Sequence, residues 1–536
     1  MAGHYRPVDR DQVYLMPPSM AEWLPVEHPV WFVIEVVKDL EPELRRFRAR
    51  EVLGGSGRAA YDPMMLVTLM AYALWQGVRS SRQIEVRCQT DVAFRIICAQ
   101  DPPDHSTIAR FRKAHAAAFE DLFTRILLLC ARSGMGRFGK VAIDGTKIAA
   151  NAAKAANVTV DSIRRVAEEE VAAGLAADAD DPADDQAPPP SVLRDRTQRL
   201  QRVERVRQEL EAEQARLDQG EADAQAKALE YVEQVRRTRR GGKRPKRADA
   251  IEVARARYER ERARQQARID EWEAERAKPL TERTRAYLGA PPQPVDQAAP
   301  VRCAREALEQ AERDAVTKPA GSDRQQGRPG SAEPKQIKRN ITDPDSRLMP
   351  TRDGFIQGYN VQAAVSEDHL ITAIKVTNTP ADVTQAVPMA EATDAAATMI
   401  AEHTGRDTTI GLKEYDAGYD SDANLEALGD TALIANAKRR EHERVAATRP
   451  AQGPPPPGAT PREAMDHRLR TPEGRAAYRR RGAIVEPVFG ILKEALGIRR
   501  FLTRGTANVT GEVNLAAAVH NLRRLFNHIA QTAGAH

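Results

Sequence analysis

A long, strongly charged segment interrupts this chain of 536 residues and excludes a single continuous globular core. From about residue 158 to residue 340 the sequence is charged, Ala-rich and interrupted by proline. It includes DADDPADDQAPPP, an acidic linker without the large apolar side chains that a core needs. The flanking sequences are apolar at regular spacing, so we expect several domains with a solvated insertion between them.

The insertion itself contains two helical patterns. The first has an a/d-like seam of apolar residues among Arg, Glu and Gln, at Leu200, Val203, Leu210 and Leu217. The second is a polar helix that carries Ile251, Tyr258, Ile269 and Trp272. The basic run RRTRRGGKRPKR (236–247) separates them, so we expect a helical hairpin with a basic tip. Two interpretations of the tip stay open: contact with DNA, or a solvated arm without a specific ligand.

Residues 15–134 predict an all-helical N-terminal domain. PMMLVTLMAYALWQGV and FEDLFTRILLLCARSG have apolar residues at helical spacing and glycine at their ends, which is typical of buried helices. Between them lies DPPDHSTIARFRKAH, which predicts a helix with three basic residues, Arg110, Arg112 and Lys113. This helix either contacts DNA phosphates or has the charged outer face common to many helices.

Short apolar strands and helices alternate on both sides of the insertion. Lys140–Ile148 predicts a first strand, and GFIQGYNVQAAVSEDHLITAIKVTN predicts two strands joined by a tight turn. The pattern then continues as helix, strand, helix, strand and helix. The predicted fold class is therefore α/β, a mixed sheet with flanking helices formed by residues 135–157 and 341–530, with the charged helical insertion (158–340) between the first and second strands.

Three acidic residues stand where strands and helices are predicted to meet. Asp144 lies within the first strand, where a buried carboxylate is costly unless it is paired or binds a metal. Asp416 ends the strand TTIGLKEY, and Glu486 lies on the apolar helix VEPVFGILKEAL. Carboxylate oxygens suit Mg²⁺, and two such ions about 3.5–4 Å apart serve phosphodiester chemistry. If the three acids meet in the fold, they would form a two-metal site; the sequence alone does not show that they meet.

Several classes of protein are excluded by what the sequence lacks. The start MAGHYRPVDRDQVYL has no apolar core, so no secretory signal is expected. The longest apolar run, Met64–Trp75, is too short to span a bilayer. Cys88, Cys98, Cys130 and Cys303 form no CxxC pair and have no His at zinc-ligand spacing. We expect a cytoplasmic protein without a membrane partner, whose formal charge of +5 permits a polyanionic one.

Several segments in combination resemble bacterial insertion-sequence transposases of the DDE type. The similar group has a helical N-terminal domain and a Tyr/Arg/Glu/Lys signature around the third acid. The segments are AIDGTKIAANA, DGFIQGYNVQAAV, YDAGYDSDANL, YRRRGAIVEPVFGILKEALGIRRFLTRG, YDPMMLVTLMAYALWQGVRSSRQIE and PDHSTIARFRKAH. The resemblance covers about residues 15–155 and 340–530 and leaves out the charged insertion.

This resemblance implies a role for each acid. Asp144, Asp416 and Glu486 correspond to the first, second and third catalytic acids, which would hold two Mg²⁺ ions, with Mn²⁺ as a substitute. The implied fold is RNase H-like, a mixed five-stranded sheet with the acids at adjacent strand ends and on a late helix. No nucleotide cofactor and no covalent enzyme intermediate are expected.

The signature around the third acid implies residues that contact DNA. Tyr478, Arg481 and Lys493 match it, and Lys493 follows the acid by seven positions, about two turns along one helix face. The spacing from Arg481 to the acid is one residue longer than in the commonest form of the signature. Arg480 is therefore an alternative to Arg481.

The implied function is DNA transposition. The chain would bind the terminal inverted repeats of its own mobile element, join them as a homo-oligomer, cut the element end and transfer it to target DNA, which would place it on the nucleoid. Two alternatives stay open. One is an RNase H-like nuclease that cuts without joining, and the other is a decayed transposase that only binds DNA.

Overall fold

The computed structural model divides the chain into two compact units. Unit 1 comprises residues 1–157 and 339–536, and unit 2 comprises residues 158–338, the range of the charged segment. The structure describes residues 19–48, 60–167, 190–238, 242–284, 289–317, 337–436, 444–445, 448 and 450–533. Within these ranges, no helix combines the length and the apolar character needed to cross a membrane.

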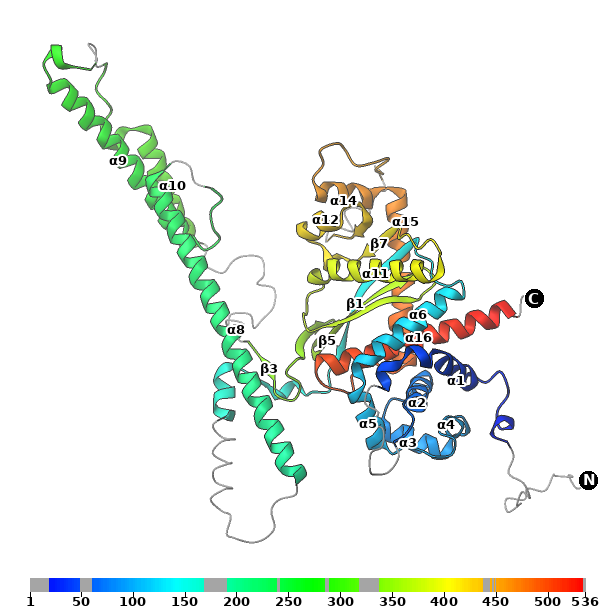
Figure 1. Cartoon of the computed structure of the whole chain (residues 1–536). Coiled ribbons are helices and arrows are strands. Elements are labelled where there is room, and N and C mark those ends of the chain that lie inside the picture. The colour runs from blue at the N-terminus through cyan, green and yellow to red at the C-terminus, as the bar shows by residue number, and fades with distance from the viewer. Residues whose placement is uncertain are drawn as a thin grey trace, which may run out of the picture. The chain divides into compact units, whose positions relative to one another are not determined.

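A six-stranded mixed sheet forms the centre of unit 1 (Figure 1). Its order is β4-β5-β1-β7-β8, and β6 pairs with a different part of β5 from β4. Strand β1 is antiparallel to β5 and parallel to β7, which is parallel to β8. The strands are β1 (Lys140–Ala149), β4 (Arg347–Thr351), β5 (Gly354–Ser366), β6 (Ile371–Thr377), β7 (Leu412–Tyr415) and β8 (Ala432–Ile434).

These strands confirm the predicted mixed α/β fold with a helical N-terminal region. Strand β4 was not predicted, because RLMPT contains a proline and does not alternate clearly between apolar and polar residues. Within the described ranges of unit 1, the α-helices are α1 (Pro29–Leu40), α2 (Pro63–Trp75), α3 (Ser81–Thr90), α4 (Val92–Ile97), α5 (His105–Ala114), α6 (Phe119–Arg132), α11 (Ala386–Thr404), α12 (Asp422–Leu428), α14 (Pro461–Arg470), α15 (Pro472–Gly490) and α16 (Thr506–Ala533).

Helices cover both faces of the sheet. The hydroxyl of Tyr415 in β7 donates to the carbonyl oxygen of Ala386 in α11 at 3.2 Å. Ile143 of β1 pairs with Tyr415, so the next residue, Asp144, points to the opposite face. There Asp144 meets Arg481 of α15. Helix α11 therefore lies on one face and α15 on the other.

The N-terminal helices and the sheet share one hydrophobic core. Helix α16 joins them, because it packs against α2, α6 and β6. It is continuously buried from Gly511 to Leu522, and at Gly511 a Cβ atom would lie only 2.5 Å from the carbonyl oxygen of Ala116. Residue 134, where we expect the helical domain to end, is therefore not a boundary between compact units.

The two crossings between the units lie next to each other in the fold of unit 1. The chain leaves unit 1 after Asn157, at β2 (Asn157–Val158), and returns at β3 (Arg339–Asn340), and these two short strands pair. The amide of Ile341 donates to the carbonyl oxygen of Ala156 at 3.0 Å. The side chain of Asn340 donates to the carbonyl oxygen of Ala153 at 2.8 Å.

Unit 2 contains three long helices, α8 (Pro190–Arg237), α9 (Ala250–Ala277) and α10 (Ala299–Thr317) (Figure 1). Helices α8 and α9 run parallel. Arg236, near the end of α8, pairs with Glu259 well inside α9, whereas Arg247, before α9 begins, pairs with Glu221 farther back in α8. Helix α10 returns along α9, since Arg305 lies over the ring of Tyr258.

The expected hairpin thus consists of α9 and α10 and not of α8 and α9. The described residues 242–247 of the basic run do not form a hairpin tip, because they lie along α8 before α9 starts. This path buries a small apolar cluster between the parallel helices, formed by Ala228, Tyr231, Val235, Ala248, Val253 and Ala256.

Two side chains of α16 attach this helix to the start of β6. The amide group of Asn521 accepts from the backbone nitrogen of Ile371 at 3.0 Å and donates to its carbonyl oxygen at 2.9 Å. Nε2 of His520 lies 2.9 Å from the carbonyl oxygen of His369. His520 is 1% exposed, so its side chain is buried in the core and stabilises the packing of α16.

Acid should weaken unit 1 through His520. Burial lowers the pKa of His520 to about 4, while the unfolded state protonates near about 6.5. The unfolded state therefore binds more protons between these values, and stability falls as the pH decreases from about 6.5 towards 4. Between pH 7.5 and pH 5, the free energy of unfolding of the wild type should fall by about 2 kcal/mol more than that of His520→Gln. Urea unfolding at the two pH values measures this difference. The exposed control His403→Gln should keep the wild-type pH dependence.

Candidate active site

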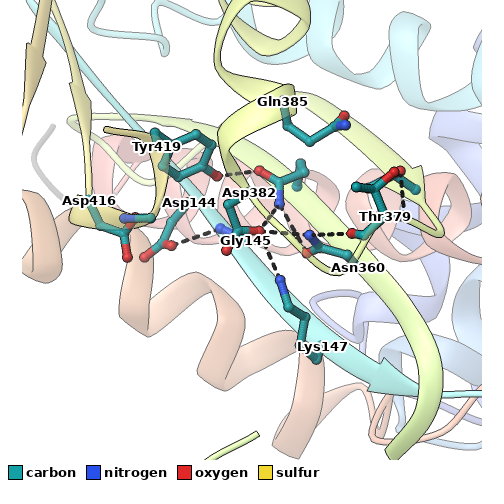
Figure 2. A network of polar contacts seen from close by, with 12 residues as sticks. Asp144, Gly145, Lys147, Asn360, Thr379, Asp382, Gln385, Asp416 and Tyr419 are labelled. Atoms are coloured by element: carbon teal, nitrogen blue, oxygen red, sulfur yellow. Dashed lines mark hydrogen bonds and ion pairs between the residues drawn. The ribbon is translucent and has the colours of Figure 1, made fainter. Parts of the chain in front are cut away.

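Two of the three predicted acids lie side by side where β7 ends (Figure 2). The parallel strands pair Ile143 with Tyr415, and the next residues along the two strands are Asp144 and Asp416. Strand β1 continues to Ala149 against β5, whereas β7 stops at Tyr415. The edge of β1 is therefore free of β7 from Asp144 onward.

Backbone amides hold both carboxylates in place. The amide of Gly145 donates to Oδ1 of Asp144 at 2.7 Å, and the amide of Gly418 donates to Oδ1 of Asp416 at 2.8 Å. Asp416 thereby caps the short helical turn that follows it. Both carboxylates are half-buried and in fixed orientations, as ligands or catalytic acids need to be.

Arg481 of α15 supplies the positive charge at this acidic pair. Burial and the carboxylate of Asp144 raise the pKa of Asp416. Nη1 of Arg481 donates to Oδ2 of Asp144 at 2.9 Å, and the two side chains are 12% and 19% exposed. Burial opposes the charge of Arg481, but Asp144 outweighs it and the pKa of Arg481 is raised. The ion pair therefore offsets part of the repulsion between the two carboxylates.

The third predicted acid, Glu486, stands apart from this pair. It is exposed on α15 and folds back over its own helix, where a Cβ atom at Gly482 would lie 3.1 Å from its Oε1. Five residues separate it from Arg481, which corresponds to about 140° around an α-helix. Helix α15 thus directs Arg481 towards Asp144 and turns Glu486 elsewhere. In the part of the chain that the structure describes, no group of three or more His, Cys, Asp or Glu side chains is placed to hold a metal ion.

The donor set at the acidic pair fits a hard divalent cation in its chemistry. Carboxylate oxygens are the ligands that Mg²⁺ prefers, and a cation would relieve the repulsion that raises the pKa of Asp416. Asp144 and Asp416 provide two such ligands together. One oxygen of Asp144 is occupied by Arg481, and Glu486 would have to move to become a third ligand.

Two residues of the predicted signature, Tyr478 and Arg481, are neighbours on α15. The guanidinium carbon of Arg481 lies 5.7 Å from the centre of the Tyr478 ring, and this ring packs against the hydrophobic core. Arg480 is exposed beside them. The geometry therefore separates the two arginines that the sequence leaves as alternatives, since Arg481 contacts the first acid and Arg480 faces solvent.

Lys493 does not follow Glu486 on one α-helical face. The α-helix ends at Gly490, and a π-helical turn (Ile491–Ala495) follows, in which the amide of Leu496 bonds to the carbonyl oxygen five residues earlier at 2.9 Å. A π turn holds more residues than an α turn, so the expectation of two regular turns is wrong. Lys493 is half-buried, and burial lowers its pKa.

The predicted basic helix of the N-terminal region is α5, and it presents two of its three charges. Arg110 and Lys113 are exposed. Arg112 points inward and donates to the carbonyl oxygen of Arg79 at 2.8 Å, and burial lowers its pKa. Arg112 is thus bound within unit 1, while Arg110 and Lys113 form the outer basic surface of α5.

Sequence reasoning missed Asp382, which lies behind β1 on the face opposite Asp144 (Figure 2). It is 24% exposed, and its Oδ1 accepts three hydrogen bonds of 2.7–2.8 Å, from Lys147, Asn360 and Gln362. The signal that could have revealed it is the pair of amide side chains in GYNVQAAV, an otherwise apolar strand. Polar residues at alternate positions of a buried strand need a partner on that face.

Gly145 allows Asp382 to approach the strand that carries Asp144. A Cβ atom at Gly145 would lie 2.7 Å from Oδ1 of Asp382 and 2.2 Å from the amide nitrogen of Gln362. Gln362 in turn accepts a hydrogen bond from the hydroxyl of Tyr419, in the turn after Asp416. One polar network therefore supports both segments that carry the acids.

Comparison with known protein families gives two matches. Residues 18–114 match a family model described as a transposase domain (DUF772), and these residues contain α1 to α5. Residues 438–526 match a family model described as a transposase DDE domain, which includes α14, α15 and most of α16. Glu486 lies inside the second match, whereas Asp144 and Asp416 lie outside both. No curated protein and no solved structure matches the chain.

Replacing Asp382 should destabilise unit 1, because Lys147 would keep a buried charge without a carboxylate. Lys147 is only 15% exposed, so we expect Asp382→Asn to lower the free energy of unfolding by about 2–3 kcal/mol. The double variant Lys147→Met/Asp382→Asn should lose less than the sum of the two single variants. Glu494→Gln, which breaks the exposed pair with Arg499, should change stability by no more than about 0.5 kcal/mol. Additive losses in the cycle would contradict a coupled pair.

Proposed function

We propose that this chain, which is an insertion-sequence transposase of the DDE type, binds the terminal inverted repeats of its element and catalyses hydrolysis and strand transfer at their ends. The observation that carries the proposal is the adjacent placement of Asp144 and Asp416 at one edge of the sheet. DDE transposases use divalent metal ions. The proposal for this chain is two Mg²⁺ ions, with Mn²⁺ as a substitute.

The catalytic region is proposed to be RNase H-like. Without β4, the strand order is β6-β5-β1-β7-β8, with the first two pairs antiparallel and the last two parallel. This order supports the proposal, since it places the acids on the central strand and at the end of its parallel neighbour. The resemblance implies acids at adjacent strand ends; Asp416 directly follows β7, whereas Asp144 lies within β1 at the level where β7 stops.

Each side chain of the site has a proposed role. Asp144 and Asp416 would hold the metal, which would supply a Lewis acid for the charge that develops on the phosphate. Glu486 would join them by a change of its exposed side chain. Arg481, once it leaves Asp144, would donate hydrogen bonds to the scissile phosphate through its planar guanidinium. The ring of Tyr478 would support this guanidinium, and Lys493 would contact the DNA backbone.

DNA contact outside the catalytic site is proposed for α5. Arg110 and Lys113 are exposed on the outer surface of α5, within the N-terminal match, and could bind phosphates of the terminal repeat. Target DNA would occupy the same catalytic edge after cleavage. Joining two element ends needs two copies of the site, so the proposal includes a homo-oligomer assembled on DNA.

An assay of cleavage and strand transfer on the element ends tests the three acids. With Mg²⁺, we expect Asp144→Asn, Asp416→Asn and Glu486→Gln each to lose at least about 10³-fold in both steps and to keep binding DNA. Glu473→Gln is the matched control, because Glu473 is another exposed glutamate of α15. It should retain wild-type activity.

Other outcomes of this assay would select a different function. Activity retained in Glu486→Gln would mean that the third acid is misassigned. Wild-type cleavage without joining would indicate the nuclease alternative. Binding of the terminal repeats without any cleavage would indicate a protein that only binds DNA.

Binding of Mn²⁺ without DNA should report the competition between Arg481 and a metal for Asp144. We expect Arg481→Gln to bind Mn²⁺ about tenfold more tightly in calorimetry, because one oxygen of Asp144 becomes available and a positive charge is removed. The matched control Arg480→Gln removes the same charge from the exposed neighbouring position and should have a smaller effect. Equal affinities of the wild type and Arg481→Gln would refute the competition.

A further inference from the structure

The segment between α8 and α9 carries the densest positive charge in the sequence. Residues 236–247, which we call the basic crossover, contain eight Arg or Lys residues and no acidic residue. The structure describes residues 236–238 and 242–247 of it. None of the proposed catalytic roles uses this segment.

Part of this charge is neutralised within unit 2. Arg236 pairs with Glu233 and Glu259 at 2.7 and 3.1 Å. Arg237 pairs with Glu233 at 2.9 Å, and Arg247 reaches back to Glu221 of α8 at 2.8 Å. These arginines explain how the crossover is held against the helices.

Among the described residues, three further basic side chains of the crossover do not form such ion pairs. Lys243, Arg244 and Lys246 are exposed, and in the described part of unit 2 no carboxylate forms an ion pair with them. The chain that carries them is held in place on both sides. The hydroxyl of Tyr231 donates to the carbonyl oxygen of Gly242 at 3.3 Å, and Ala248 is buried in the cluster between α8 and α9.

We propose that Lys243, Arg244 and Lys246 form a binding surface for the phosphate backbone of duplex DNA. A short segment held by the hydrogen bond at Gly242 and by the buried Ala248 presents three cations at low cost in conformational entropy. Residues 236–247 contain no aromatic side chain, so the surface lacks the stacking platforms of single-strand binding proteins. It would therefore bind DNA through charge and independently of base sequence. The choice of DNA as the polyanion rests on the proposed function.

The salt dependence of DNA binding tests this surface. The full chain and the variant Lys243→Gln/Arg244→Gln/Lys246→Gln would be titrated with a random-sequence duplex that lacks element ends, in EDTA, between 50 and 200 mM salt. Each lost phosphate contact lowers the slope of log affinity against log salt by about 0.9, so we expect a slope shallower by about 2.7. The ratio of the wild-type affinity to the variant affinity should therefore fall about 40-fold between 50 and 200 mM salt.

A charge-matched control separates this surface from net charge. Arg257→Gln/Arg264→Gln/Arg268→Gln removes three exposed charges from α9 of the same unit and should leave the slope unchanged. An unchanged slope in the crossover variant, equal losses in both variants, or a wild type that does not bind the duplex would overturn the proposal. The assay contains no metal and no element ends. Failure of end cleavage with an intact salt effect would therefore count against the proposed catalytic function alone.

Discussion

Repulsion between Asp144 and Asp416 is the electrostatic constraint on which the arrangement of unit 1 depends. Their strands are parallel neighbours, so the two carboxylates cannot separate without breaking the sheet. Helix α15 packs where Arg481 reaches Asp144. In the structure, the guanidinium of Arg481 supplies the positive charge that offsets part of this repulsion. On the opposite face of β1, Gly145 leaves room for Asp382 and Gln362.

The strands of Asp144 and Asp416 could be predicted from the sequence, because their apolar patterns are local. Their adjacency is a long-range contact between β1 and β7, which the resemblance implied and the local patterns did not. The orientation of Glu486 could not be predicted, since the rotation of α15 about its axis depends on its packing against the strands β1, β5 and β7. Asp382 was not predicted because its partners Asn360 and Gln362 lie about twenty residues earlier on another element.

The insertion shows a related limit of sequence patterns. Composition and spacing indicate long polar helices, and α8, α9 and α10 are such helices. The direction of one helix relative to the next is not encoded by the spacing of apolar residues. Here the connection after Arg237 is long enough to return along α8, and burial of Tyr231 and Val235 against Val253 favours the parallel arrangement.

The pairing of β2 with β3 makes unit 1 tolerant of what lies between them. Asn157 and Arg339 are adjacent in the fold although about 180 residues separate them in sequence. The entropic cost of closing such a loop grows only with the logarithm of its length. The stability of unit 1 should therefore depend only weakly on the length of the segment inserted between β2 and β3. This junction is accordingly a natural place at which a lineage can gain, lose or exchange an accessory module, and at which a reporter domain could be grafted without redesign of the sheet.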